Sequence, residues 1–192
     1  EILRDDLGMR RVKFTPMAGG HTGAYTAVMT SPDGRSAFMK WATGGAIFGR
    51  QSLTREVSAH VWLPESVVGS AKLLASRRND EGIAASFGVS RAHPIQHWNT
   101  KNINAAVKAV RAAHATLKIA EAPIGLADVD SRLSRALDDK TNPWKKDVHK
   151  FAEMAFTSQY RDEVSHGDLH RGNILVPEVM AAATIVDWAS VS

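Results

Sequence analysis

The run HGDLHRGN at positions 166–173 combines two histidines, an aspartate, an arginine and an asparagine within eight residues. An apolar run, ILV at 174–176, follows it directly and has the composition of a buried strand. A strand of the core does not need so many polar neighbours, whereas a site that handles charged atoms does. We therefore interpret this run as part of a functional site.

The spacing of this run is His-x-Asp-x-x-x-x-Asn, formed by His166, Asp168 and Asn173. It is a relaxed form of the catalytic loop of protein kinases. Phosphoryl transfer also needs a lysine that holds the phosphates, an acid that holds this lysine, a glycine-rich turn and oxygen ligands for Mg²⁺. The chain offers candidates for all of these parts in one order along the sequence.

With its His-Gly-Asp loop, apolar strand and Asp187-Trp188 pair, the chain resembles the aminoglycoside phosphotransferase and choline kinase superfamily. The resemblance implies an α+β, protein-kinase-like fold of two lobes, with an antiparallel-sheet N-lobe and a mainly helical C-lobe. Members of this family usually continue well past the Asp-Trp pair. The resemblance therefore also implies that the C-lobe is incomplete in this sequence.

The family pattern assigns roles to residues of this loop and of the strand after it. Asp168 matches the catalytic carboxylate, His166 the residue that braces the loop, and Asn173 and Asp187 the two Mg²⁺ ligands. His170 stands where protein kinases usually have a lysine, so we expect it to reach the transferred phosphate.

Upstream residues match the nucleotide-binding parts of the family. Lys40 matches the phosphate-holding lysine, and Glu56, 16 residues later, matches its ion-pair partner. Gly20 and Gly23 match the turn over the phosphates, although AGGHTG has an alanine where the first glycine of a complete motif would stand. The segment Ser86, Phe87 and Gly88 matches the hinge that offers backbone groups to adenine or guanine.

For some of these residues, an interpretation without any role in catalysis or binding stays open. The glycine-rich segment could be a plain hairpin loop, and Lys40 could be a solvated strand end. Glu56 could belong, with Arg50 and Arg55, to an ordinary exposed helix face.

The predicted elements place these residues in two domains, an N-lobe at 1–89 and a C-lobe at 90–192. Alternation of apolar and polar residues predicts a strand at 11–17. The turn signal SPDGR predicts strands on either side of it, at 24–30 and 36–42, and the turn RRNDEG predicts two more strands within 71–89. Helical spacing predicts helices at 49–63, from 102 onward, at 127–139 and at 144–161. In the second predicted helix, which begins at 102, Ile103, Val107 and Val110 are predicted to form the apolar face. The segments ILV and ATIVD predict a small hairpin.

Composition narrows the class of protein. The chain has 192 residues and a net charge of +4. It contains no cysteine, so disulfides and thiolate metal sites are excluded, and this composition suits a cytoplasmic protein. We found neither a Lys/Arg run typical of nucleic-acid binding nor an apolar stretch of about 20 residues, so neither nucleic acid nor membrane is an expected partner.

The sequence thus predicts a kinase of small molecules that uses Mg²⁺ and ATP or GTP. The expected partners are the nucleoside triphosphate and a hydroxyl acceptor, with an antibiotic such as an aminoglycoside as the first candidate. A metabolic kinase acting on choline, a sugar or an amino acid is the alternative. A nucleotide-binding pseudokinase without transfer activity is a third possibility, and the sequence does not predict the oligomeric state.

Overall fold

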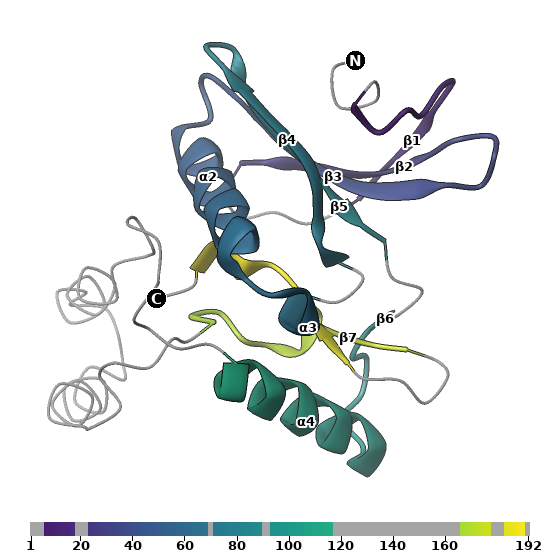
Figure 1. Ribbon diagram of the computed structural model, residues 1–192, viewed down its shortest axis with the longest axis vertical. Coiled ribbons are helices and arrows are strands. Elements are labelled where there is room, and N and C mark those ends of the chain that lie inside the picture. Colours follow the sequence, from purple (N-terminus) through teal and green to yellow (C-terminus); the bar gives the residue numbers. More distant parts are fainter. Residues whose placement is uncertain are drawn as a thin grey trace, which may run out of the picture.

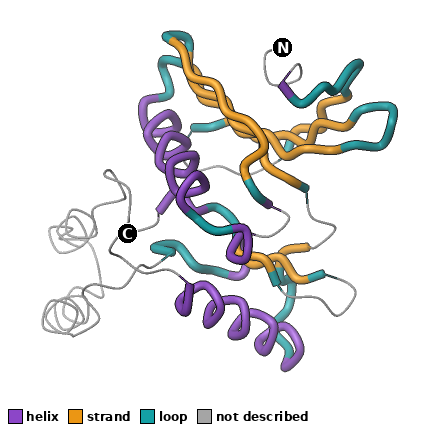
Figure 2. Tube along the Cα trace, in the orientation of Figure 1, coloured by secondary structure: helices purple, strands orange, loops and turns teal. Residues whose placement is uncertain are grey.

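A computed structural model of the chain describes residues 6–17, 23–68, 71–89, 93–116, 166–177 and 183–190. A five-stranded sheet and helix α2 lie at one end, helix α4 lies at the other, and a small sheet lies between them (Figure 1). The tube in Figure 2 shows how the long strands are concentrated in the first of these regions. The chain therefore has the sheet-rich first half that the sequence predicts.

The larger sheet is antiparallel throughout, in the order β1-β2-β3-β5-β4. Its strands are β1 (Lys13–Pro16), β2 (Tyr25–Thr30), β3 (Ser36–Thr43), β4 (Leu73–Asn79) and β5 (Gly82–Gly88). All five predicted strands are present. The predicted turn between β2 and β3 contains Gly34 with a φ of 84°, a left-handed conformation that glycine adopts without strain.

Side chains of β3 alternate between two cores, and this alternation places Lys40. Ala37 and Met39 pack on one face with Met29 and Met9, while Ala42 packs on the other face with Leu53 of α2. Because successive side chains of a strand point to opposite faces, Lys40 lies on the same face as Ala42. The lysine is thus directed towards α2.

Helix α2 (Ile47–Trp62) covers that face of the sheet, and its chain turns into an extended conformation at Leu63, before Pro64. Its start lies two residues before the predicted one, and its end agrees with the predicted stop at the proline. The buried side of α2 includes Glu56 and His60 beside Leu53. Two polar groups therefore lie in an otherwise apolar interface.

The smaller sheet joins three short strands, β6 (His93–Pro94), β7 (Ile174–Val176) and β8 (Thr184–Ile185), in that order. The predicted hairpin of β7 and β8 is confirmed. The pairing of β6 with β7 was not predicted, because a strand of two residues has no detectable periodicity. A one-turn helix, α3 (Glu65–Val68), was also not predicted.

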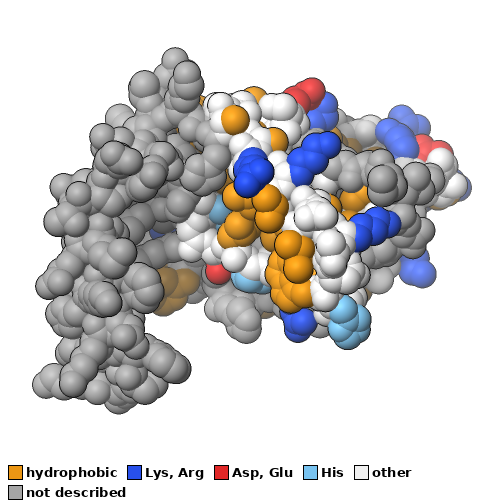
Figure 3. All heavy atoms as spheres, turned by 90° about the horizontal axis from the view of Figure 1, so that it is seen from below, with side chains coloured by type: hydrophobic (Ala, Val, Ile, Leu, Met, Phe, Trp, Pro, Cys, Tyr) orange, Lys and Arg blue, Asp and Glu red, His pale blue; other side chains and the backbone are white. Residues whose placement is uncertain are grey.

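Helix α4 (Thr100–Thr116) is present where a helix was predicted, but its predicted apolar face is confirmed only for Val110, which packs against the core. Ile103 and Val107 are 45% and 43% exposed, whereas Ala106 and Ala113 are buried. Small side chains allow α4 to pack closely against β7 and α3, which the larger residues would prevent. The side of the molecule on which α4 lies carries hydrophobic side chains next to Lys and Arg (Figure 3).

Two further predicted helices, at 127–139 and 144–161, lie outside the described residues. The division into domains 1–89 and 90–192 stays a prediction, and it coincides with the connection between β5 and β6. No helix in the described ranges is both long and apolar enough to cross a membrane.

Candidate active site

Lys40 and Glu56 form a buried ion pair between the sheet and α2. The Lys40 Nζ lies 2.8 Å from both carboxylate oxygens of Glu56. The lysine side chain is 14% exposed and that of the glutamate 4%. This geometry removes the interpretation of Glu56 as part of an exposed helix face. It also shows that Lys40 is not a solvated strand end.

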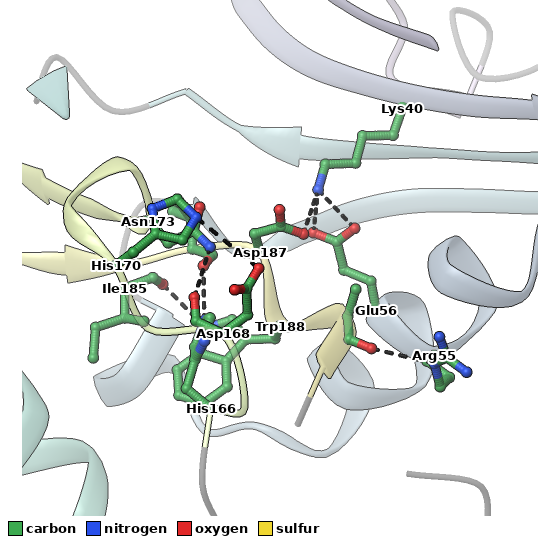
Figure 4. A network of polar contacts seen from close by, with 12 residues as sticks. Lys40, Arg55, Glu56, His166, Asp168, His170, Asn173, Ile185, Asp187 and Trp188 are labelled. Carbon is green, nitrogen blue, oxygen red and sulfur yellow. Dashed lines mark hydrogen bonds and ion pairs between the residues drawn. The ribbon is translucent and has the colours of Figure 1, made fainter. Parts of the chain in front are cut away.

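Asp187 is a second partner of Lys40 that sequence spacing did not reveal. The Lys40 Nζ donates to Asp187 Oδ1 at 2.9 Å, so one ammonium group bridges two carboxylates (Figure 4). Asp187 has a φ of 65°, in the left-handed region that few residues other than glycine and asparagine or aspartate adopt. The next residue, Trp188, is 1% exposed and its indole N–H donates to the carbonyl oxygen of Ile185 at 3.0 Å. The buried indole thus anchors the turn that presents Asp187.

Burial and neighbouring charges shift the pKa values of Lys40 and Glu56 in opposite directions. Burial raises the pKa of Glu56 to about 7, against the lowering effect of the neighbouring Lys40 charge. Burial alone would lower the pKa of Lys40, but the carboxylates of Glu56 and Asp187 outweigh it, and the pKa lies above its usual value. The lysine therefore remains a cation.

Asn173 shapes the loop from inside. It ends a short 3₁₀ turn (Arg171–Asn173), is 7% exposed, and its side-chain amide donates to the backbone carbonyl of Asp168 at 3.0 Å. The amide N–H₂ is thereby directed at the backbone, which leaves the side-chain oxygen as the group available to a ligand.

His166 braces the loop from below. Its Nε2–H donates to the carbonyl oxygen of Val186 at 2.9 Å, and its ring packs against Trp188 with centroids 4.5 Å apart. Burial lowers the pKa of His166, so the ring is neutral. These contacts join the loop to the Asp187 turn, and the catalytic role expected of His166 stays a prediction.

Asp168 and His170 lie on the open side of the site, with side chains 56% and 57% exposed. The His170 Nδ1 accepts the backbone N–H of Gly172 at 3.0 Å. This bond leaves Nε2 as the ring nitrogen that can carry a proton, and it lies 4.0 Å from Asp168 Oδ2. His170 is therefore oriented towards the predicted catalytic carboxylate. Its expected contact with the transferred phosphate stays a prediction.

The proposed Mg²⁺ ligands fit the ion chemically. Asn173 directly precedes β7 and Asp187 lies two residues after β8, and between them the Val186 N–H donates to the Asn173 carbonyl at 3.0 Å. Both offer oxygen atoms, and Mg²⁺ sites commonly combine one or two protein oxygens with phosphate and water. Within the described ranges there is no group of three or more His, Asp or Glu suited to a metal.

The other predicted nucleotide-binding residues are only partly placed. Gly20 lies outside the described residues. Gly23 has a φ of 77°, and an added Cβ would lie 3.9 Å from Ala46 Cβ, at the start of α2. Ser86, Phe87 and Gly88 lie within β5, where they pair with β3. Because Ser86 and Phe87 pair with β4 as well, their backbone groups belong to the sheet, and the nucleotide-binding role of these residues stays a prediction.

His60 is a residue of this region that sequence reasoning missed. It is 8% exposed, one turn after Glu56, and its Nδ1 has no hydrogen-bond partner among the described residues. Its ring packs against Phe87, with centroids 4.9 Å apart. Burial lowers its pKa to about 4, with a further contribution from Lys40. Helical spacing from Glu56 was the available signal, since i and i+4 side chains share a face.

No protein-family model matches the sequence, and no curated protein matches it. Solved structures do. An aminoglycoside-3'-phosphotransferase of type VIII is 20% identical, with a TM-score of 0.65 over 94% of this chain and 72% of its own. A macrolide 2'-phosphotransferase from Brachybacterium faecium is 14% identical, with a TM-score of 0.65 over 99% of this chain and 70% of its own.

An amicoumacin kinase, solved in complex with AMP-PNP, Ca²⁺ and Ami, is 12% identical, with a TM-score of 0.67 over 100% of this chain and 64% of its own. The chain has the fold of the aminoglycoside phosphotransferases. The protein-kinase-like architecture that the resemblance implied is therefore confirmed. At identities of 20% or less, the likeness concerns the fold.

Proposed function

We propose that this chain transfers the terminal phosphate of ATP or GTP to a hydroxyl group of a small molecule. The observation that carries the proposal is the Lys40 ammonium held between Glu56 and Asp187, in the same constellation as the Asp168 loop (Figure 4). Phosphoryl transfer is catalysed mainly by positioning and by electrostatic stabilisation, and these residues supply both.

On the phosphate side, the Lys40 ammonium binds non-transferred phosphate oxygens, and Glu56 keeps it in place. Asn173 and Asp187 would hold Mg²⁺, which supplies positive charge to neutralise the phosphates. Asp187 also accepts from Lys40, so its carboxylate would link the lysine to the ion. Its carboxylate is 42% exposed, so it can reach a ligand without leaving the fold.

On the acceptor side, Asp168 orients the hydroxyl group and accepts its proton. The hydroxyl oxygen forms a bond to the terminal phosphorus. The bond between this phosphorus and the bridging oxygen breaks, and the nucleoside diphosphate leaves with that oxygen. His170, held by the Gly172 N–H, positions its Nε2 beside the carboxylate. General-base assistance of this kind contributes about 10²–10⁴ to the rate.

An antibiotic is the first candidate for the acceptor. The three structures compared above are named for an aminoglycoside, a macrolide and amicoumacin, which supports an antibiotic without selecting one. The residues assigned here handle phosphate and proton, and these tasks are common to all acceptors. Choline, sugars and amino acids therefore remain the alternative acceptors of a metabolic kinase. The adenine nucleotide in the amicoumacin kinase complex supports ATP as the first donor to test.

The test is coupled release of nucleoside diphosphate with Mg-ATP and with Mg-GTP, across aminoglycosides, macrolides, amicoumacin, choline and sugars. Asp168→Asn is the matched control, because it replaces the carboxylate by an amide of the same shape on an exposed side chain. A release rate that depends on one compound and falls at least about 10²-fold in the variant is the expected result.

Two outcomes would overturn the proposal. A rate that is equal in the wild type and in Asp168→Asn would remove the carboxylate from the reaction. Nucleotide binding without stimulation by any acceptor would favour the pseudokinase interpretation, in which the same residues bind nucleotide but transfer nothing.

A further inference from the structure

The Asp187 carboxylate has two assignments that draw on one negative charge. It is a proposed ligand of Mg²⁺, and its Oδ1 accepts a hydrogen bond from the Lys40 Nζ at 2.9 Å. Figure 4 shows this contact together with the Glu56 carboxylate on the same ammonium group. A cation that binds Asp187 therefore meets a positive charge that is already beside it.

The ammonium group of Lys40 is held in this position from several sides. Both carboxylate oxygens of Glu56 accept from it at 2.8 Å, and Glu56 is buried in the interface between α2 and the sheet. The rings of Phe38 and Phe87 lie close to it, with centroids 6.0 and 5.9 Å from the Nζ. The positive charge of Lys40 is thus fixed next to Asp187.

Two cations that share one carboxylate repel each other. Mg²⁺ lies about 2.0–2.1 Å from an oxygen that ligates it, and the Lys40 Nζ lies 2.9 Å from Oδ1 of the same side chain. At such short separations the Coulomb repulsion is large even with the dielectric constant typical of a protein surface. The charge-assisted hydrogen bond also takes up part of the negative charge that would attract the ion. Both effects weaken Asp187 as a ligand for a cation that arrives alone.

Phosphate oxygens change this balance. They are anionic acceptors for the Lys40 ammonium, and they are also preferred ligands of Mg²⁺. The Asp187 side chain is 42% exposed, so a phosphate and its cation can reach it from solvent. A phosphate bound to Lys40 would place negative charge beside both cations and reduce their repulsion.

We propose that Lys40 suppresses the binding of divalent cations at Asp187 until a phosphate engages the lysine, so that cation and nucleotide enter the site together. The inference rests on the proposed function, which assigns the nucleotide to Lys40 and the cation to Asp187. By thermodynamic linkage, each of the two ligands then strengthens the binding of the other by the same factor.

The double variant Lys40→Met/Glu56→Gln isolates the effect of the ammonium group. It removes one positive and one negative charge, so the net charge of the protein stays the same. The matched control is Lys72→Met/Glu65→Gln, which removes another Lys–Glu pair, 2.6 Å apart, at the surface. Asp187→Asn, added to the double variant, removes the proposed ligand itself.

The measurement is the binding of Mn²⁺, a paramagnetic substitute for Mg²⁺, by electron paramagnetic resonance in the absence of nucleotide. We expect Lys40→Met/Glu56→Gln to bind Mn²⁺ about 5- to 150-fold more tightly than the wild type, the usual range of coupling between two binding events. The control should stay within about twofold of the wild type, since exposed ion pairs contribute little. The gain should disappear when Asp187→Asn is added.

Equal Mn²⁺ affinities of the wild type and the double variant would overturn the inference, as would a gain that survives Asp187→Asn. If the double variant does not fold, Lys40→Gln with Lys72→Gln as its control gives the same comparison, and the same gain is expected. None of these measurements uses phosphate transfer. A protein that shows the gain without transferring phosphate would contradict the proposed function alone, and one that transfers phosphate without the gain would contradict this inference alone.

Discussion

The two sides of the candidate active site differ in how far the fold fixes them. Lys40 and Glu56 have side chains that are 14% and 4% exposed, and the Lys40 Nζ lies 2.8 Å from both carboxylate oxygens of Glu56. Asp168 and His170, by contrast, are 56% and 57% exposed, and their closest approach is 4.0 Å. One side is assembled before any ligand binds, and the other faces solvent.

The difference follows from the chemistry that each side is proposed to perform. A phosphate-holding lysine meets the same polyanion in every cycle, so it can be fixed in a buried network. A catalytic carboxylate must meet an acceptor that enters from solvent, so it cannot be enclosed. Buried charges interact strongly but also pay a desolvation penalty, whereas exposed charges contribute little to stability. Substitutions on the buried side should therefore lower the stability of the fold, whereas substitutions on the exposed side should lower the rate of transfer and leave stability nearly unchanged.

The largest effect on stability is expected for Lys40→Met. The substitution leaves Glu56 buried without its partner, and removing one member of a buried pair costs about 3–5 kcal/mol. The double variant Lys40→Met/Glu56→Gln, which removes both charges, should recover most of this loss without recovering phosphoryl transfer. Urea denaturation measures the free energy of unfolding of all three proteins. A loss under about 1 kcal/mol in the single variant would mean that the pair is solvated.

His60→Leu should change how stability depends on pH. The pKa of His60 is lowered to about 4 in the folded protein, so the unfolded chain binds more protons between about pH 4 and 6.5. The wild type therefore loses stability as the pH falls through this range, by up to about 3 kcal/mol from this group. The variant should lack that loss. If the free energy of unfolding depended on pH in the same way for both proteins, protonation of His60 would not destabilise the folded state, and the prediction would be wrong.

Gly172→Ala should disturb the exposed side with a smaller effect on stability. An added Cβ would lie 2.8 Å from Cε1 and 3.0 Å from Nδ1 of the His170 ring, so the ring must move. The loss of its hydrogen bond should cost about 1 kcal/mol, and the rate of transfer should fall. In a His170→Ala background the same substitution should have no effect on the rate. A rate that falls equally in both backgrounds would mean that Gly172 acts independently of His170.

The smallest effect on stability is expected for Asp168→Asn. Substitutions of exposed side chains usually change the free energy of unfolding by less than about 0.5 kcal/mol. The same variant should lose about 10²–10⁴ of its transfer rate. Thermal unfolding and the diphosphate-release assay on one preparation give both values. A large loss of stability would show that the loop, like the buried side, depends on its charge for folding.

Much of the architecture could be predicted because its signals are local. Alternating residues predicted the five strands of the larger sheet, and Pro64 predicted the end of α2. The spacing of the HGDLHRGN run indicated which residues the loop would bring together, since eight residues with one short turn leave few arrangements. The resemblance then implied the correct fold.

Other features depend on contacts between distant segments, which no local pattern encodes. The buried face of α4 consists of alanines because of its close approach to β7 and α3, and the larger residues Ile103 and Val107 are left exposed. The bond between Lys40 and Asp187 joins residues 147 positions apart. A surface hollow lined by Arg50 and Arg55 of α2 and by Arg78 of β4 likewise requires β4 to lie beside α2.

The sequence by itself determined the order of the elements and the types of the chemical groups, because both are expressed in periodicity and in short spacings. The tertiary structure alone decided which groups are buried and which charges meet. Burial raises the pKa of Glu56 and lowers that of His60, and it separates the buried side of the site around Lys40 from its open side. These properties depend on the whole surroundings of a residue, and those surroundings exist only after the chain has folded.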